Sequence, residues 1–164
     1  MKNLEIYIHI PFCVRKCEYC DFLSFPADDD AKLRYVKGLM AEMIFYGPLM
    51  KNYQVSSVYI GGGTPSSIDE QWIAALMEGV FDCFNVLPDA EISIECNPGT
   101  LSREKLLAYR DAGINRLSIG LQSANNDELK LLGRIHTFEQ FVTNYEVARN
   151  VGFKNINVDL MYVL

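Results

Sequence analysis

The stretch "LEIYIHIPFCVRKCEYCDF", residues 4–22, joins an alternating apolar run to three closely spaced cysteines. Within residues 4–10, isoleucines occupy every second position from the third residue onward, which is typical of a β-strand. Cys13, Cys17 and Cys20 follow with the spacing C-x3-C-x2-C. Three thiolates hold a metal centre but leave a four-ligand centre one ligand short. The stretch therefore predicts a strand followed by a metal-binding loop with one coordination place open.

Apolar runs like the first one recur along the chain and alternate with helical patterns. Strands are predicted at 4–10, 56–60, 90–95, 115–122 and 155–163. Helices are predicted after the acidic residues 28–30, after Asp69, after Ser102, near 126–132 and over 137–150. Strands that alternate with helices indicate right-handed crossovers and a parallel sheet. The predicted fold class is α/β, with one domain over residues 1–164.

Each predicted strand has one apolar face and one polar face, because side chains alternate along a strand. A parallel sheet that is covered on both sides would be apolar on both faces. The large polar groups lie near the carboxyl ends of the strands: Tyr7, Glu95, Gln122 and Asp159. A curved sheet that closes toward a barrel would aim these groups at one ligand above its C-terminal rim.

Composition and charge exclude several classes of function. The chain has 15 basic and 21 acidic residues, a formal charge of −6 and no basic stripe, so nucleic acid is not expected as a partner. No run of apolar residues is long enough for an integral membrane segment, and no signal peptide is recognised. We therefore expect a cytoplasmic protein. Five cysteines in a reducing compartment favour metal binding or catalysis over disulfides.

Two kinds of metal centre fit the cysteine loop. A structural zinc site needs a fourth ligand, and the nearest histidine, His9, lies on the preceding strand as an expected packed, hydrogen-bonded residue. A [4Fe–4S] cluster could instead keep one iron open for a small molecule. Cys83 is expected to be a buried small hydrophobe, and Cys96 is expected to be structural although it follows Glu95.

Cys13, Cys17 and Cys20, with the aromatic Tyr19 before the last cysteine, resemble the signature of the radical S-adenosylmethionine (SAM) enzymes. Further stretches resemble the branch that contains oxygen-independent coproporphyrinogen III oxidase. They are "YIHIPFC" (7–13), "GGGTPS" (61–66), "IECNPG" (94–99), "RLSIGLQS" (116–123), "LGRIHT" (132–137) and "DLMY" (159–162). The resemblance implies a partial, TIM-like (β/α)6 barrel, here truncated after about five β/α units.

The resemblance also implies cofactors and site residues. Cys13, Cys17 and Cys20 would hold a [4Fe–4S] cluster whose open iron binds SAM, with a low-potential electron donor as a partner. The implied contacts of the first SAM molecule are Tyr7, Gly62 and Glu95. The positions that match a second SAM site are Tyr19, Gly63, Thr64, Gln122, Arg134 and Asp159. An ordinary alternative for Arg134 is a solvated charge at a helix end. The resemblance leaves open whether one or two SAM molecules bind, and no catalytic residue is assigned.

The sequence departs from the oxidase pattern after the third cysteine. The oxidases tend to continue as C-x3-C-x2-C-x-C, whereas this chain has Cys20-Asp21-Phe22. That variant resembles the haem chaperones of the HemW type, which implies haem as a ligand and haem-acceptor proteins as partners. The alternative is a coproporphyrinogen III oxidase acting on a porphyrinogen, and a more remote one is a structural zinc domain.

The second departure is the end of the chain, where Val163 replaces a glycine of the family pattern. Family members are more than twice as long. We therefore expect the chain to be the N-terminal part of a radical SAM core domain, with its fifth strand as an open sheet edge. We expect this part to bind the cluster but to lack the complete activity of the family.

Overall fold

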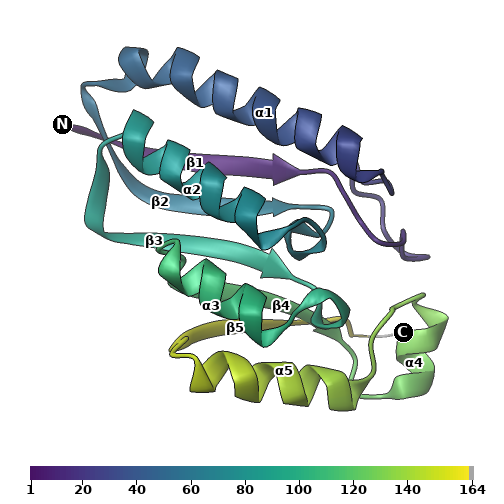
Figure 1. Cartoon of the computed structure of the whole chain (residues 1–164). Helices are drawn as coiled ribbons and strands as arrows, with labels where there is room; N and C mark the ends of the chain where they lie inside the picture. The colour runs from purple at the N-terminus through teal and green to yellow at the C-terminus, as the bar shows by residue number, and fades with distance from the viewer. Residues whose placement is uncertain (163–164) are drawn as a thin grey trace.

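The computed structural model describes residues 1–162 (Figure 1). The strands are β1 (Lys2–Ile10), β2 (Tyr53–Gly62), β3 (Val86–Cys96), β4 (Arg116–Gln122) and β5 (Asn155–Leu160). The α-helices are α1 (Asp29–Tyr46), α2 (Glu70–Cys83), α3 (Arg103–Asp111), α4 (Asn126–Leu131) and α5 (Phe138–Asn150). Three short 3-10 helices are η1 (Gly47–Met50), η2 (Pro65–Ser67) and η3 (Pro98–Thr100). No helix in residues 1–162 is long and apolar enough to cross a membrane.

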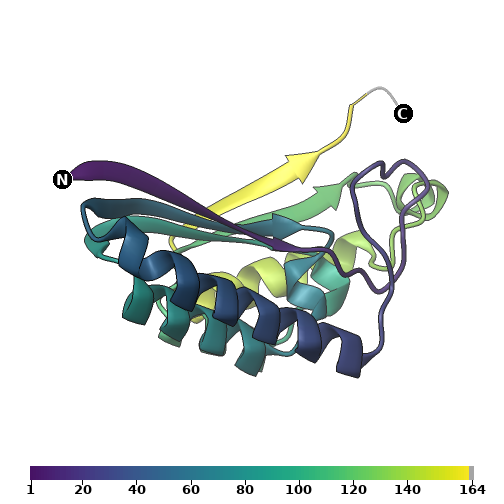
Figure 2. The ribbon, with the colours of Figure 1, turned by 90° about the horizontal axis from the view of Figure 1, so that it is seen from above.

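The five strands form one parallel sheet in the order β1-β2-β3-β4-β5. Figure 2 shows α1, α2, α3 and α5 on one side of this sheet, while the opposite side carries no helix within the described residues. The predicted α/β fold with a parallel sheet is therefore confirmed. One-sided cover also explains why each strand has one apolar face and one polar face.

The core lies between the sheet and the helices. Ile10, Ile60, Ile94 and Ile119 project from four neighbouring strands and are fully shielded from solvent. Burying one such side chain stabilises a fold by roughly 1.5–3 kcal/mol. This apolar layer fixes which strand face points away from the helices, and therefore which polar side chains line the open face.

The predicted helix starts are confirmed by side-chain caps. Asp28 accepts a hydrogen bond from the Ala31 amide at 2.7 Å, and Asp69 accepts one from the Gln71 amide at 2.8 Å. Ser102 caps α3 in the same way. Each cap satisfies an amide that lacks a partner in the first helical turn, which is worth about 1 kcal/mol.

Two expectations from the sequence are wrong in detail. β5 ends at Leu160 instead of residue 163, and Val163 lies outside the described residues. Cys83 is only partly buried, in the last turn of α2 against Gly47.

Candidate functional site

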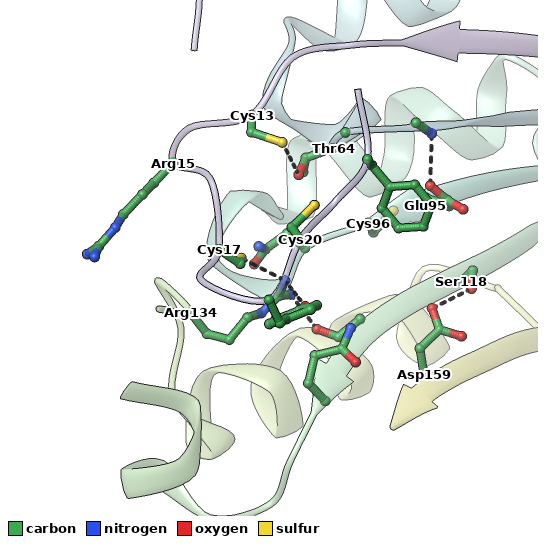
Figure 3. Close-up of a pocket in the computed structure, with 17 residues that line it drawn as sticks. Cys13, Arg15, Cys17, Cys20, Thr64, Glu95, Cys96, Ser118, Arg134 and Asp159 are labelled. Atoms are coloured by element: carbon green, nitrogen blue, oxygen red, sulfur yellow. Dashed lines mark hydrogen bonds between the residues drawn. The ribbon is translucent and has the colours of Figure 1, made fainter. Parts of the chain in front are cut away.

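A single pocket lies between the cysteine loop and the carboxyl ends of the strands (Figure 3). Of the residues predicted to form the site, all except Tyr7 line this pocket. They are Cys13, Cys17, Tyr19, Cys20, Gly62, Gly63, Thr64, Glu95, Gln122, Arg134 and Asp159. These residues come from segments more than 100 positions apart, and the parallel sheet brings them together because its carboxyl ends share one rim.

The cysteine loop is closed at its base and its three thiols face different neighbours. The Cys13 amide donates to the carbonyl of Phe25 at 3.2 Å, which ties the two ends of the loop together. The Cys13 sulfur lies 3.5 Å from Thr64 Oγ1, and the Cys20 sulfur lies 4.0 Å from the Ser24 hydroxyl. Within residues 1–162, no three His, Cys, Asp or Glu side chains are gathered closely enough to hold a metal ion.

The chemistry of the donors distinguishes the two kinds of metal centre. His9 does not line the pocket; its Nε2 lies 3.4 Å from the carbonyl of Leu23. Cys96 does line the pocket, but its buried thiol points to the carbonyl of Ile94 at 3.8 Å. Burial raises the pKa of Cys96, so its thiol stays protonated in this structure. The donor set therefore fits a centre with three protein thiolates better than a four-ligand zinc site.

The glycine turn after β2 leaves space beside the cysteine loop. Gly62 has φ +124°, and a Cβ there would lie 2.7 Å from the carbonyl oxygen of Ile10. A Cβ on Gly63 would lie 2.8 Å from the Phe12 carbonyl oxygen and 2.9 Å from the Cys13 sulfur. Both positions require glycine, since any side chain would push the turn away from the loop.

Glu95 projects from the end of β3 with both carboxylate oxygens held. The Tyr59 hydroxyl donates to Oε1 at 2.8 Å, and the Gly62 amide donates to Oε2 at 3.0 Å. Burial and the neighbouring carboxylate raise the pKa of Tyr59, so its hydroxyl stays protonated as a donor. The sequence analysis missed Tyr59, although strand alternation from Ile60 already places it on the polar face of β2.

The opposite wall of the pocket contains a second fixed carboxylate. Asp159 on β5 accepts a hydrogen bond from the Ser118 hydroxyl at 3.0 Å and one from Asn157 Nδ2 at 2.6 Å. Gln122, at the end of β4, has φ +71°. Among residues 1–162 it is the only residue other than glycine with a positive φ. Such a conformation is unusual for a side-chain-bearing residue and is found preferentially at functional sites.

Arg134 connects the cysteine loop to the second half of the sheet. Its Nη2 donates to the carbonyl of Gly120 at 2.6 Å. Its Nη1 donates to the Tyr19 hydroxyl at 3.4 Å and to the Cys17 sulfur at 3.6 Å. The buried Nε has no hydrogen-bond partner in the described residues. The guanidinium group is therefore part of the pocket wall, and the alternative of a solvated helix-end charge is wrong.

Tyr7 lies beside the pocket, outside its lining residues. The side chain is 58% exposed, and its ring stacks against Tyr59 with the centroids 6.2 Å apart. Its hydroxyl lies 3.0 Å from Nδ1 of His9, so the expected hydrogen-bonded role of His9 is confirmed. Tyr7 on β1 thus faces the same open side of the sheet as Glu95 on β3, with β2 between them.

Comparison with known families identifies the chain. The model of the family described as "Radical SAM superfamily" matches residues 7–164. The chain belongs to the radical SAM superfamily. Membership of this superfamily implies a [4Fe–4S] cluster and SAM, and the three thiols that line the pocket are the kind of donor that such a cluster takes.

Several relatives of this radical SAM chain are haem chaperones. It is 39% identical to "Heme chaperone HemW" of Escherichia coli, over 98% of this chain and 43% of that protein. It is also 39% identical to the protein of the same name from Bacillus subtilis, over 96% of this chain and 42% of that protein. A Bos taurus protein, "Radical S-adenosyl methionine domain-containing protein 1, mitochondrial", is 37% identical over 98% of this chain and 36% of its own length. The chain thus spans less than half the length of these relatives.

Solved radical SAM structures share the fold. Coproporphyrinogen III oxidase (HemN) from Escherichia coli superposes with a TM-score of 0.91 and 34% sequence identity, covering 99% of this chain and 38% of that one. The structure titled "Native anSMEcpe with bound AdoMet" matches with a TM-score of 0.65 at 13% identity, covering 95% of this chain and 42% of that one. The second likeness concerns the fold alone. The predicted TIM-like radical SAM fold, in a truncated form, is confirmed.

Proposed function

We propose that this chain is the cluster-binding part of a radical SAM haem chaperone of the HemW type, with residues 1–164 forming one incomplete domain. The main support for this proposal is the pocket, which brings three thiols, a glycine turn and two hydrogen-bonded carboxylates to one rim of the sheet. The identity to proteins named haem chaperones and the Asp21-Phe22 pair after the last cysteine support the haem-binding role.

In this proposal, Cys13, Cys17 and Cys20 hold the [4Fe–4S] cluster. The three thiols face different neighbours in this structure and would converge on the cluster. Between its ends the loop is held at Cys17 by Arg134 and at Glu18, whose amide donates to the carbonyl of Leu132 at 3.2 Å. When bound, the cluster and SAM supply one-electron chemistry, while the protein supplies position and shelter from water.

The chain's own residues provide the SAM contacts in two groups. Gly62 lets the backbone approach the methionine part of the first SAM molecule, Glu95 accepts hydrogen bonds from this molecule, and Tyr7 contacts it. A second group lines the same pocket and would hold a further SAM molecule. Its members are Tyr19, Gly63, Thr64, Gln122, Arg134 and Asp159.

A second candidate function is the oxidative decarboxylation of coproporphyrinogen III. The specific support is the likeness to the oxidase structure, with a TM-score of 0.91 at 34% identity. Both proposals require a low-potential electron donor to reduce the cluster. The chaperone proposal adds haem and a haem-acceptor protein, and it places both in the cytoplasm.

The first test concerns the metal centre. Anaerobic reconstitution with iron and sulfide is expected to give about four iron and four sulfide per chain. Replacing any one of Cys13, Cys17 and Cys20 by alanine is expected to abolish most of the cluster absorbance, because each removes a ligand. Cys83→Ala is the matched control and is expected to keep the full content, since this thiol lies in α2 outside the pocket. Recovery of one tightly held zinc and no sulfide would contradict the proposal.

The second test separates the chaperone from the oxidase. The reconstituted chain is incubated with haem and, separately, with coproporphyrinogen III. A full-length version of the protein is treated in the same way. Stable haem absorbance that passes to an added apo-haemoprotein supports the chaperone. Release of carbon dioxide from coproporphyrinogen III without stable haem binding overturns it in favour of the oxidase.

A further inference from the structure

Three side chains on the open face of the sheet converge above Gly61. A Cβ built on Gly61 would lie 2.9 Å from Tyr59 Cε1, 3.1 Å from Tyr7 Cε2 and 3.2 Å from Glu95 Cδ. Each of these distances is shorter than an ordinary carbon contact of about 3.5–4 Å. The absent side chain of Gly61 therefore provides the space in which Tyr59 reaches across to Glu95.

The sheet register brings Tyr59 and Glu95 within reach of each other. Tyr59 on β2 pairs with Ser93 on β3, and Glu95 lies two residues further along the same strand face. Diagonal neighbours at this spacing are reached only by long side chains. The tyrosine ring spans the gap and is supported from behind by its stacking on Tyr7.

Glu95 is fixed by both of its oxygens and still has acceptor capacity. The Tyr59 hydroxyl donates to one oxygen at 2.8 Å and the Gly62 amide donates to the other at 3.0 Å. Each carboxylate oxygen accepts about two hydrogen bonds, so each keeps one position for another donor. Glu95 lines the pocket, whereas Tyr59 does not.

We propose that Tyr59 is a positioning residue, which holds the Glu95 carboxylate in the orientation that receives the hydrogen-bond donors of SAM. This inference rests on the proposed function, in which Glu95 contacts SAM. Tyr59 acts through Glu95, because its hydroxyl donates to the Glu95 carboxylate and Tyr59 itself does not line the pocket. Holding the carboxylate before the ligand arrives lowers the ordering cost of binding.

The contact itself is tested without cluster or SAM, by a double-mutant cycle on the unfolding equilibrium of the chain. Tyr59→Phe is expected to raise the unfolding constant about tenfold when Glu95 is present, since a hydrogen bond to a charged group is lost. In the Glu95→Ala background the same replacement is expected to have little effect. Equal effects in both backgrounds would overturn the inference.

The role in binding is tested on the anaerobically reconstituted chain, with the dissociation constant of SAM as the readout. Tyr59→Phe is expected to weaken SAM binding about tenfold and to add nothing to the loss caused by Glu95→Ala. Gly61→Ala is a second variant, whose added methyl group would disturb the contact between Tyr59 and Glu95 from both sides. Tyr53→Phe, at the far end of β2, is the matched control and is expected to leave SAM affinity unchanged.

The outcomes distinguish the inference from the proposed function. If the parent chain binds SAM and both Tyr59→Phe and Gly61→Ala bind it equally well, the positioning role is wrong and the proposed function stands. If the reconstituted parent chain binds no SAM, the proposed function fails and the positioning role fails with it. A loss of SAM affinity by Tyr59→Phe in the Glu95→Ala background also overturns the inference, because Tyr59 would then act on its own.

Discussion

At the scale of single residues, the pocket depends on the side chains that are absent as much as on those present. Gly63 illustrates this point, because a Cβ there would meet the Phe12 carbonyl oxygen and the Cys13 sulfur at less than 3.0 Å. The first is backbone and cannot move without shifting the loop. The sequence analysis assigned Gly63 to SAM, and the structure adds a reason that concerns the cysteine loop.

Gly63→Ala is therefore expected to lower the cluster content of the reconstituted chain by about half or more, because the extra methyl group displaces Cys13 from the turn. Iron and sulfide analysis measures the change. Gly38→Ala is the matched control, since nothing lies within 4 Å of a Cβ at that position in α1. It is expected to keep the cluster and to stabilise the chain by about 0.5–1 kcal/mol. Full cluster content in Gly63→Ala would contradict this account.

At the scale of elements, a buried histidine joins the residue that follows β3 to the end of β4. His136 is 4% exposed, and its Nδ1 lies 3.2 Å from Asn97 Oδ1 while its Nε2 lies 3.3 Å from the carbonyl of Leu121. Burial, and to a smaller extent the nearby Arg134, lower the pKa of His136 from 6.5 to about 4. The folded chain therefore keeps this imidazole neutral.

This predicts a loss of stability on mild acidification. Between pH 6.5 and about 4, the unfolded chain binds a proton at His136 and the folded chain does not. Stability therefore rises with pH across this window and falls by up to about 1.4 kcal/mol per unit as the pH is lowered. Urea unfolding at several pH values measures this slope.

The control for the pH prediction uses the fact that the chain has two histidines. His136→Asn is expected to reduce the slope between pH 6.5 and 4, and to lower stability at pH 7 because the buried contacts change. His9→Asn is expected to keep the slope, since His136 is still present. An unchanged slope in His136→Asn would show that other groups cause the acid sensitivity.

At the scale of the whole molecule, the sheet has an open face within the described residues, and β1 and β5 are its two edge strands. The open edge at β5 ends in Leu160, which is 64% exposed. Unpaired backbone groups along an edge strand offer a template for pairing with another chain. The expectation of an uncovered fifth strand from the sequence is confirmed.

The open edge predicts that the chain associates with itself as its concentration rises. Sedimentation velocity over a range of protein concentrations is expected to show a shift toward dimers and larger species. Leu160→Lys is expected to reduce this association several-fold, because a charge on an edge strand opposes pairing. Lys154→Leu, just before the strand, changes charge in the opposite sense and is expected to increase it. A chain that stays monomeric at high concentration would contradict this prediction.

The sequence by itself determined the parallel α/β fold, the helix caps and the cysteine loop. These features follow from strand alternation, capping and ligand spacing, which depend on residues a few positions apart. The family resemblance supplied eleven of the 17 residues that line the pocket. The tertiary structure alone decided how the pocket residues are held. Tyr59 reaches Glu95 across 36 positions, and Arg134 reaches Cys17 across 117. Such contacts depend on the register between strands and on the space at Gly61, which only the folded sheet fixes.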